Sequence, residues 1–196
     1  MEQIQDGTGK GYLAKVDNAN RLSTNSVTTS AQEFASANGL AYNLNTGVIT
    51  LTNATKTPVL YLKNNEDLDL IIDLVLYMTG ASTGGSGNIL VEVVRNPTSG
   101  TIVSGASNVE MNQNRNFGSS RSLSVNAYKG TTGNTLTDGV KFIESILATA
   151  TQRVAINVGA IILPKGSSIA IQITPPTGNT SMATEFAISC YLSEDL

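Results

Sequence analysis

Acidic side chains gather at one place in this sequence, at Glu66, Asp67, Asp69 and Asp73. Carboxylates at this density suggest two kinds of chemistry. A pair facing each other across roughly 5–10 Å hydrolyses glycosides, and several carboxylates together bind calcium. The spacing does not match the calcium-binding loop motif. We therefore favour solvated charge at the start of a strand, with Asp69 and Asp73 on an exposed face, and keep an acid-pair hydrolase as an alternative.

Other catalytic chemistry has little support in the residue types. The sequence contains no histidine, which is the usual general base near neutral pH and the commonest metal ligand. Cys190 is the only cysteine and lies in the alternating run 186–192. It is either a reactive thiol or a small buried side chain in a strand, and we favour the buried side chain because no histidine can activate it. The sequence thus predicts no enzyme, no metal and no cofactor.

Phosphate, nucleic-acid and membrane binding are also disfavoured. Asp6–Gly11 is glycine-rich, but it lacks the spacing of a phosphate-binding loop and has no strand before it. The 12 lysines and arginines are scattered, whereas nucleic-acid binding needs them clustered. Leu68–Met78, the longest apolar stretch, is interrupted by two aspartates and is too short to span a membrane. The first residues lack the features of a signal peptide, so we expect synthesis in a cytoplasm without export by a standard signal.

The elements that must position any site are strands. Charged residues make up only 14% of the chain, well below the roughly 25% of an ordinary globular protein. From Leu40 onward, short alternating runs are separated by Gly, Asn and Ser turns, as in a β-sandwich. Asn45-Thr46-Gly47 predicts the turn of a hairpin. The closing segments follow the order of a jelly roll, by analogy.

Two segments are ambiguous between helix and strand. Leu68–Met78 has β-branched residues and no Ala, Lys or Arg, which favours a strand. Val140–Ala150 fits either a short helix or a strand. As a strand, the first segment would place one set of side chains on one face, namely Leu70, Ile72, Leu74, Leu76 and Met78.

The predicted fold is all-β, an antiparallel, jelly-roll-like β-sandwich over residues 39–196, preceded by an extended N-terminal arm over residues 1–38. The arm is rich in Gly, Asn, Ser and Thr and cannot bury much apolar surface of its own. A capping box at Thr29 or Ser30 with Glu33 predicts one short helical turn through Phe34. The arm either gains order on another subunit or folds as a hairpin on its own domain.

The segment from Ile4 to Leu22 resembles a leader found in tailed-bacteriophage virion structural proteins. It reads IQDGTGKGYLAKVDNANRL and is followed by a Ser/Thr-rich stretch and then by 41–47, as in that group. The resemblance implies a head decoration, minor capsid or head-fibre protein, located in the virion, with no catalytic residue. The residues expected to dock the arm are Asp6, Gly7, Gly9, Gly11, Tyr12, Leu13, Val16, Arg21 and Leu22.

Partners follow from the same reasoning. We expect a homo-oligomer, with a trimer as the working number, that contacts the major capsid protein or other virion proteins. A tail or adaptor component is an alternative position. A carbohydrate- or host-surface-binding module is the alternative function, and it predicts a groove with exposed Tyr and Asn in the loops at 104–120 or 129–139.

Overall fold

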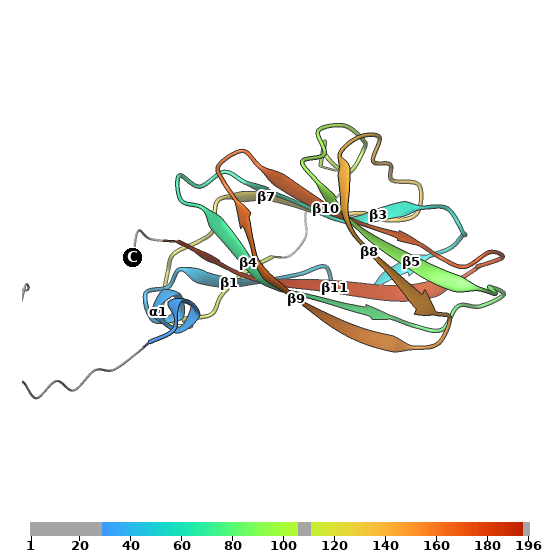
Figure 1. Cartoon of the computed structure of the whole chain (residues 1–196), viewed down its shortest axis with the longest axis horizontal. Helices are drawn as coiled ribbons and strands as arrows, with labels where there is room; N and C mark the ends of the chain where they lie inside the picture. Colours follow the sequence, from blue (N-terminus) through green and yellow to red (C-terminus); the bar gives the residue numbers. More distant parts are fainter. Residues whose placement is uncertain (1–28, 106–110, 194–196) are drawn as a thin grey trace, which may run out of the picture. The chain divides into compact units, whose positions relative to one another are not determined.

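The computed structural model of the chain describes residues 29–105 and 111–193 (Figure 1). All nine residues predicted to dock the arm, from Asp6 to Leu22, lie outside this part of the chain. The compact unit that contains the sheets begins at Ala31. Its elements are α1 (Ala31–Ala37), β1 (Ala41–Asn45), β2 (Ile49–Leu51), β3 (Thr57–Asn64), β4 (Leu70–Thr79), β5 (Asn88–Arg95), β6 (Met111–Asn114), β7 (Val125–Lys129), β8 (Val140–Ala148), β9 (Gln152–Leu163), β10 (Ser168–Thr174) and β11 (Met182–Leu192).

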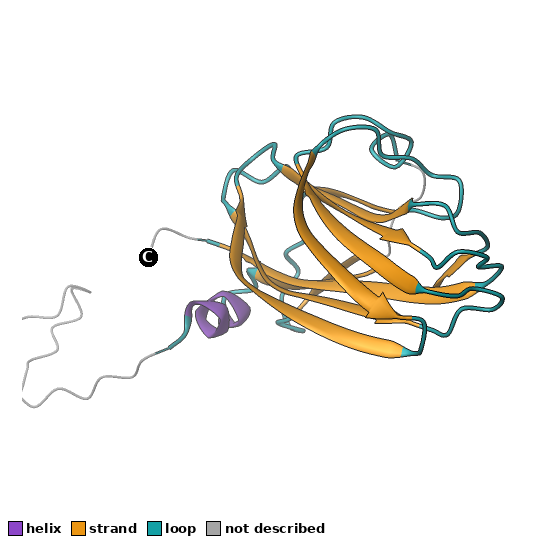
Figure 2. Ribbon diagram, turned by 45° about the vertical axis from the view of Figure 1, so that its right-hand side comes forward, coloured by secondary structure: helices purple, strands orange, loops and turns teal. Residues whose placement is uncertain are grey.

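Two antiparallel sheets pack face to face, which confirms the predicted all-β sandwich (Figure 2). One sheet has the order β6-β1-β11-β4-β9, with β2 also paired to β11, and the other has the order β7-β3-β10-β5-β8. The core between them is a continuous cluster of buried apolar side chains. Its largest fully buried members include Tyr42, Tyr77 and Phe186, and the last two stack with ring centroids 5.8 Å apart.

The strand pairing is that of a jelly roll. β1 pairs with β11, β3 with β10, β4 with β9 and β5 with β8, all antiparallel. These pairs are nested, so the chain behaves as one long hairpin ribbon rolled into two sheets. β11 then joins β4 and β10 joins β5, which closes the roll. The predicted jelly-roll-like sandwich is therefore confirmed by the pairing itself.

Both ambiguous segments are strands. Leu70–Thr79 forms β4 and Val140–Ala148 forms β8. The predicted assignment of faces in β4 was wrong beyond Ile72. The register against β11 shifts there, so that Ile72 faces Cys190 and Leu74 faces Ser189. Such a bulge at Asp73 moves Val75 and Tyr77 into the core and leaves Met78 40% exposed.

The hairpin predicted at Asn45-Thr46-Gly47 was also wrong, because β1 and β2 both pair with β11 along the same side. Thr46 provides the reason: its N–H donates to the Phe186 carbonyl at 2.9 Å, and its hydroxyl accepts from the Phe186 N–H at 3.0 Å. Gly47 adopts φ = 62°, which lets the chain step outward and return to β11. The polar triplet therefore interrupts one strand and does not reverse it.

The outer face of the β3–β10 region is covered by loops. Ile102 is fully buried there and packs with Tyr61 and Ala170, while Leu136 packs against the same cluster. This cover explains why β10 is buried on both faces although its sequence alternates strictly. At the other sheet, α1 docks through the buried Ala35 and through Gln32, which donates to Asp73 at 2.6 Å.

Candidate functional site: the open edge between β8 and β9

An apolar cavity of about 450 Å³ opens where the edges of the two sheets meet. β8 ends one sheet order and β9 ends the other. The cavity walls come from β5, β8, β9, β10 and the turn between β9 and β10. Phe142 and Ile162 are 55% and 53% exposed and line it together with core residues such as Leu163 and Ile169. The core of the sandwich thus reaches solvent along this edge.

Two more apolar side chains of β8 are exposed, and one of them, Ile146, lies on the outer face with Glu144. Val140 is 60% exposed and Ile146 is 66% exposed. Large exposed side chains of this kind, gathered on an edge strand, are typical of a protein–protein contact. We name this surface, made of Val140, Phe142, Ile146 and Ile162, the β8–β9 edge.

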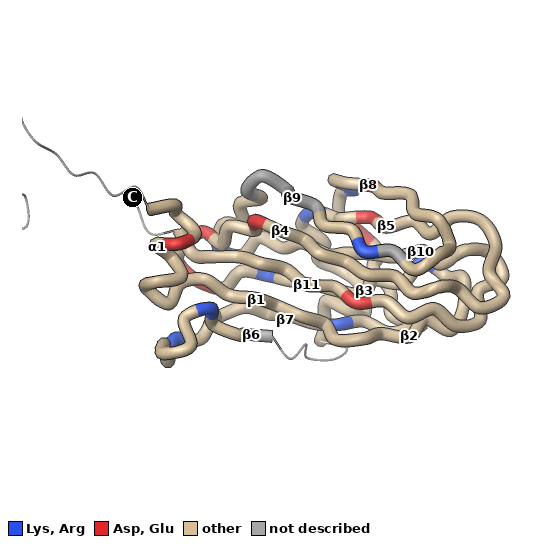
Figure 3. The backbone as a smooth tube through the Cα atoms, turned by 90° about the horizontal axis from the view of Figure 1, so that it is seen from below, with Lys and Arg blue, Asp and Glu red and all other residues tan. Residues whose placement is uncertain are grey.

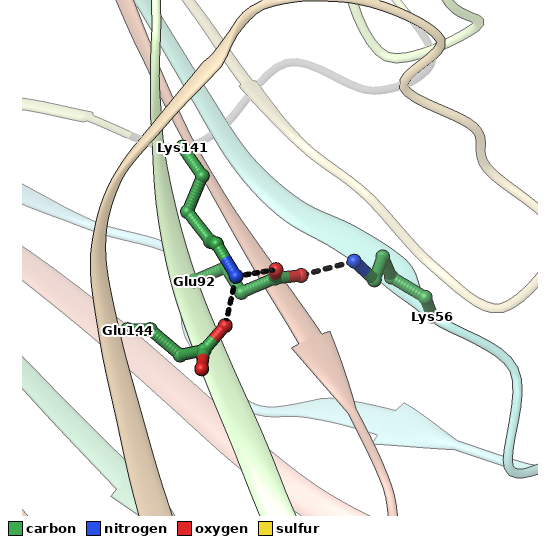
Figure 4. Close-up of polar contacts among 4 residues, drawn as sticks. All are labelled: Lys56, Glu92, Lys141 and Glu144. Atoms are coloured by element: carbon green, nitrogen blue, oxygen red, sulfur yellow. Dashed lines mark hydrogen bonds and ion pairs between the residues drawn. The ribbon is translucent and has the colours of Figure 1, made fainter.

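A cluster of four charged residues lies on the outer face beside the β8–β9 edge (Figure 4). Glu92 of β5 is buried, with 7% of its side chain exposed, and it forms ion pairs with Lys56 and Lys141. The Lys141 ammonium lies 3.6 Å from one Glu92 oxygen and also contacts Glu144. The hydrogen bond to Glu144 raises the pKa of Lys141. The two lysines thus balance the negative charge of the buried Glu92 carboxylate next to the β8–β9 edge.

The acidic residues singled out from the sequence do not form one site. Glu66 accepts the Ser124 N–H at 2.6 Å, and Asp67 pairs with Lys165, which lowers the pKa of Asp67. Asp73 accepts from Gln32, and burial raises its pKa. These three carboxylates are thus engaged with three different segments. Asp69 and Asp73 are both half-buried, so their expected position on an exposed face was wrong.

Two kinds of feature are absent from residues 29–105 and 111–193. In this part of the chain, no group of three or more His, Cys, Asp or Glu residues is arranged to hold a metal ion. The same residues include no helix that is long and apolar enough to cross a membrane. Lysines, arginines and acids are scattered along the described backbone (Figure 3).

The loops considered for sugar binding fold onto the sheet where the structure describes them. Neither loop contains a tyrosine, and Tyr128 of β7, just before the second loop, is half-buried and stacks on Tyr61 with ring centroids 6.0 Å apart. Asn134 accepts the Thr131 N–H at 2.7 Å and donates to the Thr101 hydroxyl at 3.2 Å. These contacts pack the loop at 129–139 against its neighbours and do not favour the groove that the alternative function predicts.

Cys190 lies in the core with none of its surface exposed, and its thiol faces the Tyr42 carbonyl at 3.8 Å. Burial raises the pKa of this thiol well above its ordinary value. The sequence-based preference for a buried side chain is therefore confirmed.

The β8–β9 edge, by contrast, was not predicted from the sequence. Its signal was present in Val140–Ala148, where apolar residues occupy both faces of one strand.

Comparisons with known proteins give distant likenesses. No family model and no curated protein sequence matches the chain. The X-ray structure of tomato aspermy virus is similar with a TM-score of 0.32 and 9% identity, over 89% of this chain and 84% of that chain. A selenomethionine-labelled α-amino acid ester hydrolase is similar with a TM-score of 0.16 and 11% identity, over 74% of this chain and 25% of that one. We therefore base the function on the chain's own residues.

Proposed function

We propose that this protein is a non-enzymatic structural subunit of a tailed-phage virion, of the head decoration, minor capsid or head-fibre type. The observation that carries the proposal is the β8–β9 edge, where, in residues 29–105 and 111–193, the core of a jelly-roll sandwich is open to solvent between the terminal strands of its two sheets. A subunit that assembles with other chains closes such an edge by burying it. The leader from Ile4 to Leu22 supports the assignment to a phage particle through its resemblance to virion proteins.

The composition supports assembly as well. Only 14% of the residues are charged, so few ions need desolvation when a surface of this protein meets a neighbour. The arm supplies a second means of attachment. Its glycines allow sharp turns, and Tyr12, Leu13 and Val16 provide apolar anchors on a neighbouring subunit, as in strand addition.

Two measurements test this function. Mass spectrometry of purified particles of the phage that encodes the chain is expected to find the protein as a virion component. Light scattering on the purified full chain is expected to give a closed oligomer. A protein absent from the particles would overturn the virion assignment, and binding to a glycan array would then favour the host-surface alternative.

The arm is tested in the full chain with Leu13→Asp and Val16→Asp combined. We expect this variant to keep the thermal midpoint of the sandwich and to lose binding to particles stripped of the protein. Thr28→Asp, which adds the same kind of charge outside the leader, is the control. Unchanged binding by the leader variant would show that the arm does not attach the protein.

A further inference from the structure

β8 is the terminal strand of its sheet among the residues that the structure describes, and its charged residues are placed in an unusual way. Lys141 and Glu144 are three residues apart, a spacing that in a regular strand puts side chains on opposite faces. Both nevertheless contact the outer-face cluster around Glu92. The cause is a bulge: Ile143 faces Val93, but Lys141 already faces Val94. Phe142 is the extra residue.

The bulge also determines which side of the sheet the apolar side chains of β8 face. Ile143 packs against the core and Phe142 lines the cavity beneath it, so both lie on the inner side of the sheet. The sequence Lys141-Phe142-Ile143-Glu144 therefore has its two charges on the outer side and its two apolar residues on the inner side. The charges are opposite in sign and are placed symmetrically about the centre of this segment.

This arrangement is complementary to itself. When two identical strands pair antiparallel about a two-fold axis, the register centred between Phe142 and Ile143 places Lys141 opposite Glu144 of the second copy. The same register places Phe142 opposite Ile143 of the second copy, on the inner side. Opposite charges and apolar pairs directly across two strands both stabilise a sheet.

We propose that the β8 edge binds a second copy of this chain, strand to strand about a two-fold axis, with Lys141 of each copy facing Glu144 of the other. The pairing joins two five-stranded sheets into one and packs the exposed Phe142 of each copy against Ile143 of the other. It rests on the proposed function in that both require assembly. A two-fold contact makes the copy number even, so the expected number changes from three to two, or to six where a three-fold contact is also present.

Charged residues and bulges on an edge strand also serve to prevent pairing. Glu144→Lys separates these two roles. The introduced lysine would face Lys141 of the second copy and repel it. Within its own chain it would lie directly opposite Glu92 and replace a like-charge pair by an opposite one. The change also removes the exposed pair between Lys141 and Glu144, and the new pair with Glu92 offsets this small loss. The subunit should therefore fold about as stably while losing its partner.

The experiment measures self-association of the full chain by analytical ultracentrifugation, with thermal midpoints recorded alongside. We expect E144K to raise the dissociation constant at least about tenfold without lowering the midpoint. The double variant K141E/E144K reverses both charges and is expected to restore association. Glu185→Lys, the same charge change on β11 in the other sheet, is the matched control and is expected to associate like the wild type.

Two results would overturn this contact. If E144K associates as tightly as the wild type, the oligomer forms through another surface, and the proposed function stands without this edge. If the wild-type chain is monomeric but is recovered from particles, the charges protect the edge from pairing, and the virion assignment again stands. If the chain is absent from particles, the virion assignment fails whatever the variants show.

Discussion

Glu92 and Glu144 lie directly opposite each other on β5 and β8, and the ammonium group of Lys141 contacts both carboxylates. Like charges in this position destabilise a sheet unless a cation lies between them. Glu92 depends further on Lys56, which approaches from the β3 side (Figure 4). The stability of the sheet next to its free edge thus depends on two lysines.

The first prediction concerns Lys56→Met. Glu92 would keep only the longer contact with Lys141 at 3.6 Å, and a buried carboxylate that loses a partner costs about 1–3 kcal/mol. We expect the free energy of unfolding to fall by this amount in urea titrations at pH 7. Combining Lys56→Met with Glu92→Gln should recover much of the loss, because the buried charge is then removed.

The control for this variant is Lys165→Met. Lys165 pairs with Asp67 on the surface, with 62% of its side chain exposed, and exposed pairs contribute little to stability. Its unfolding midpoint should match that of the wild type. Equal losses of stability in Lys56→Met and Lys165→Met would show that the effect does not come from the buried charge of Glu92.

A second prediction concerns Gly130, which follows β7 and donates its N–H to the Val59 carbonyl at 3.1 Å. A Cβ atom here would lie 1.8 Å from the Pro58 carbonyl oxygen. Gly130→Ala must therefore push the backbone of β7 away from β3. We expect a loss of about 1–3 kcal/mol or more in unfolding free energy, as for other overpacked sites.

Gly133→Ala is the matched comparison for Gly130. Gly133 has φ = 96° and nothing within 4 Å of the added Cβ, so its cost comes from backbone conformation alone, about 1–2 kcal/mol. Gly130→Ala should be the more destabilising of the two. The reverse order, measured by urea unfolding, would show that the contact with Pro58 relaxes easily.

How far the sequence predicts this fold depends on the regularity of each strand. Alternation over Ser168–Thr174 and Thr184–Leu192 locates β10 and β11, because period two is the property that a buried strand face requires. The same rule failed within β4. One extra residue at Asp73 exchanges the two faces, and the local sequence has no signal for it, because the bulge depends on the pairing with β11.

The candidate site was harder to predict than the fold. Exposure of Phe142 and Ile162 results from two sheet edges that meet in space although they belong to different sheets. Composition cannot tell such residues from core residues, since both are large and apolar. The ion pairs of Glu92 similarly join residues 56, 92 and 141, whose proximity follows only from the order of the strands.

A third prediction concerns Asp138, which holds the two loops over the outer sheet face. Its carboxylate accepts the N–H groups of Thr98 at 2.9 Å and Ser99 at 2.8 Å, and also the Thr98 hydroxyl. These hydrogen bonds lower the pKa of Asp138 below its ordinary 3.8. Their stabilisation is therefore complete above pH 3.8 and is lost as the pH falls through the lower, folded-state pKa.

Hydrogen exchange checks this prediction. In Asp138→Ala at pH 7, the Thr98 and Ser99 amides should exchange at least about tenfold faster than in the wild type. Asp67→Ala, in which a distant carboxylate is removed, should leave both amides unchanged. Unchanged exchange in Asp138→Ala would show that the other contacts between the loops, such as the hydrogen bond from the Thr137 N–H to the Ser99 carbonyl, hold them without Asp138.

The last prediction concerns Cys190 and alkaline pH. Burial raises the pKa of this thiol far above its ordinary 9.0, so the folded state requires the neutral thiol. The contribution of this thiol to stability is therefore fully present below pH 9. Above that value it is lost progressively, because the thiol ionises in the unfolded chain and not in the folded one. Buried Tyr42 and Tyr61, whose pKa values are raised by burial from 10.0, act in the same direction at higher pH. Stability should fall above pH 9, and less steeply in Cys190→Ala.

Thiol chemistry gives the decisive measurement. The thiolate is the reactive form, and Cys190 reaches solvent only when β11 opens. At pH 8, a disulfide reagent such as Ellman's should react with the native protein at least about a thousandfold more slowly than with the urea-unfolded chain. Fast reaction of the native protein would mean that β11, which pairs with β1, β2 and β4, opens without global unfolding. The centre of the six-stranded sheet would then be its weakest part, because the strand that joins most of its members would be the one that detaches.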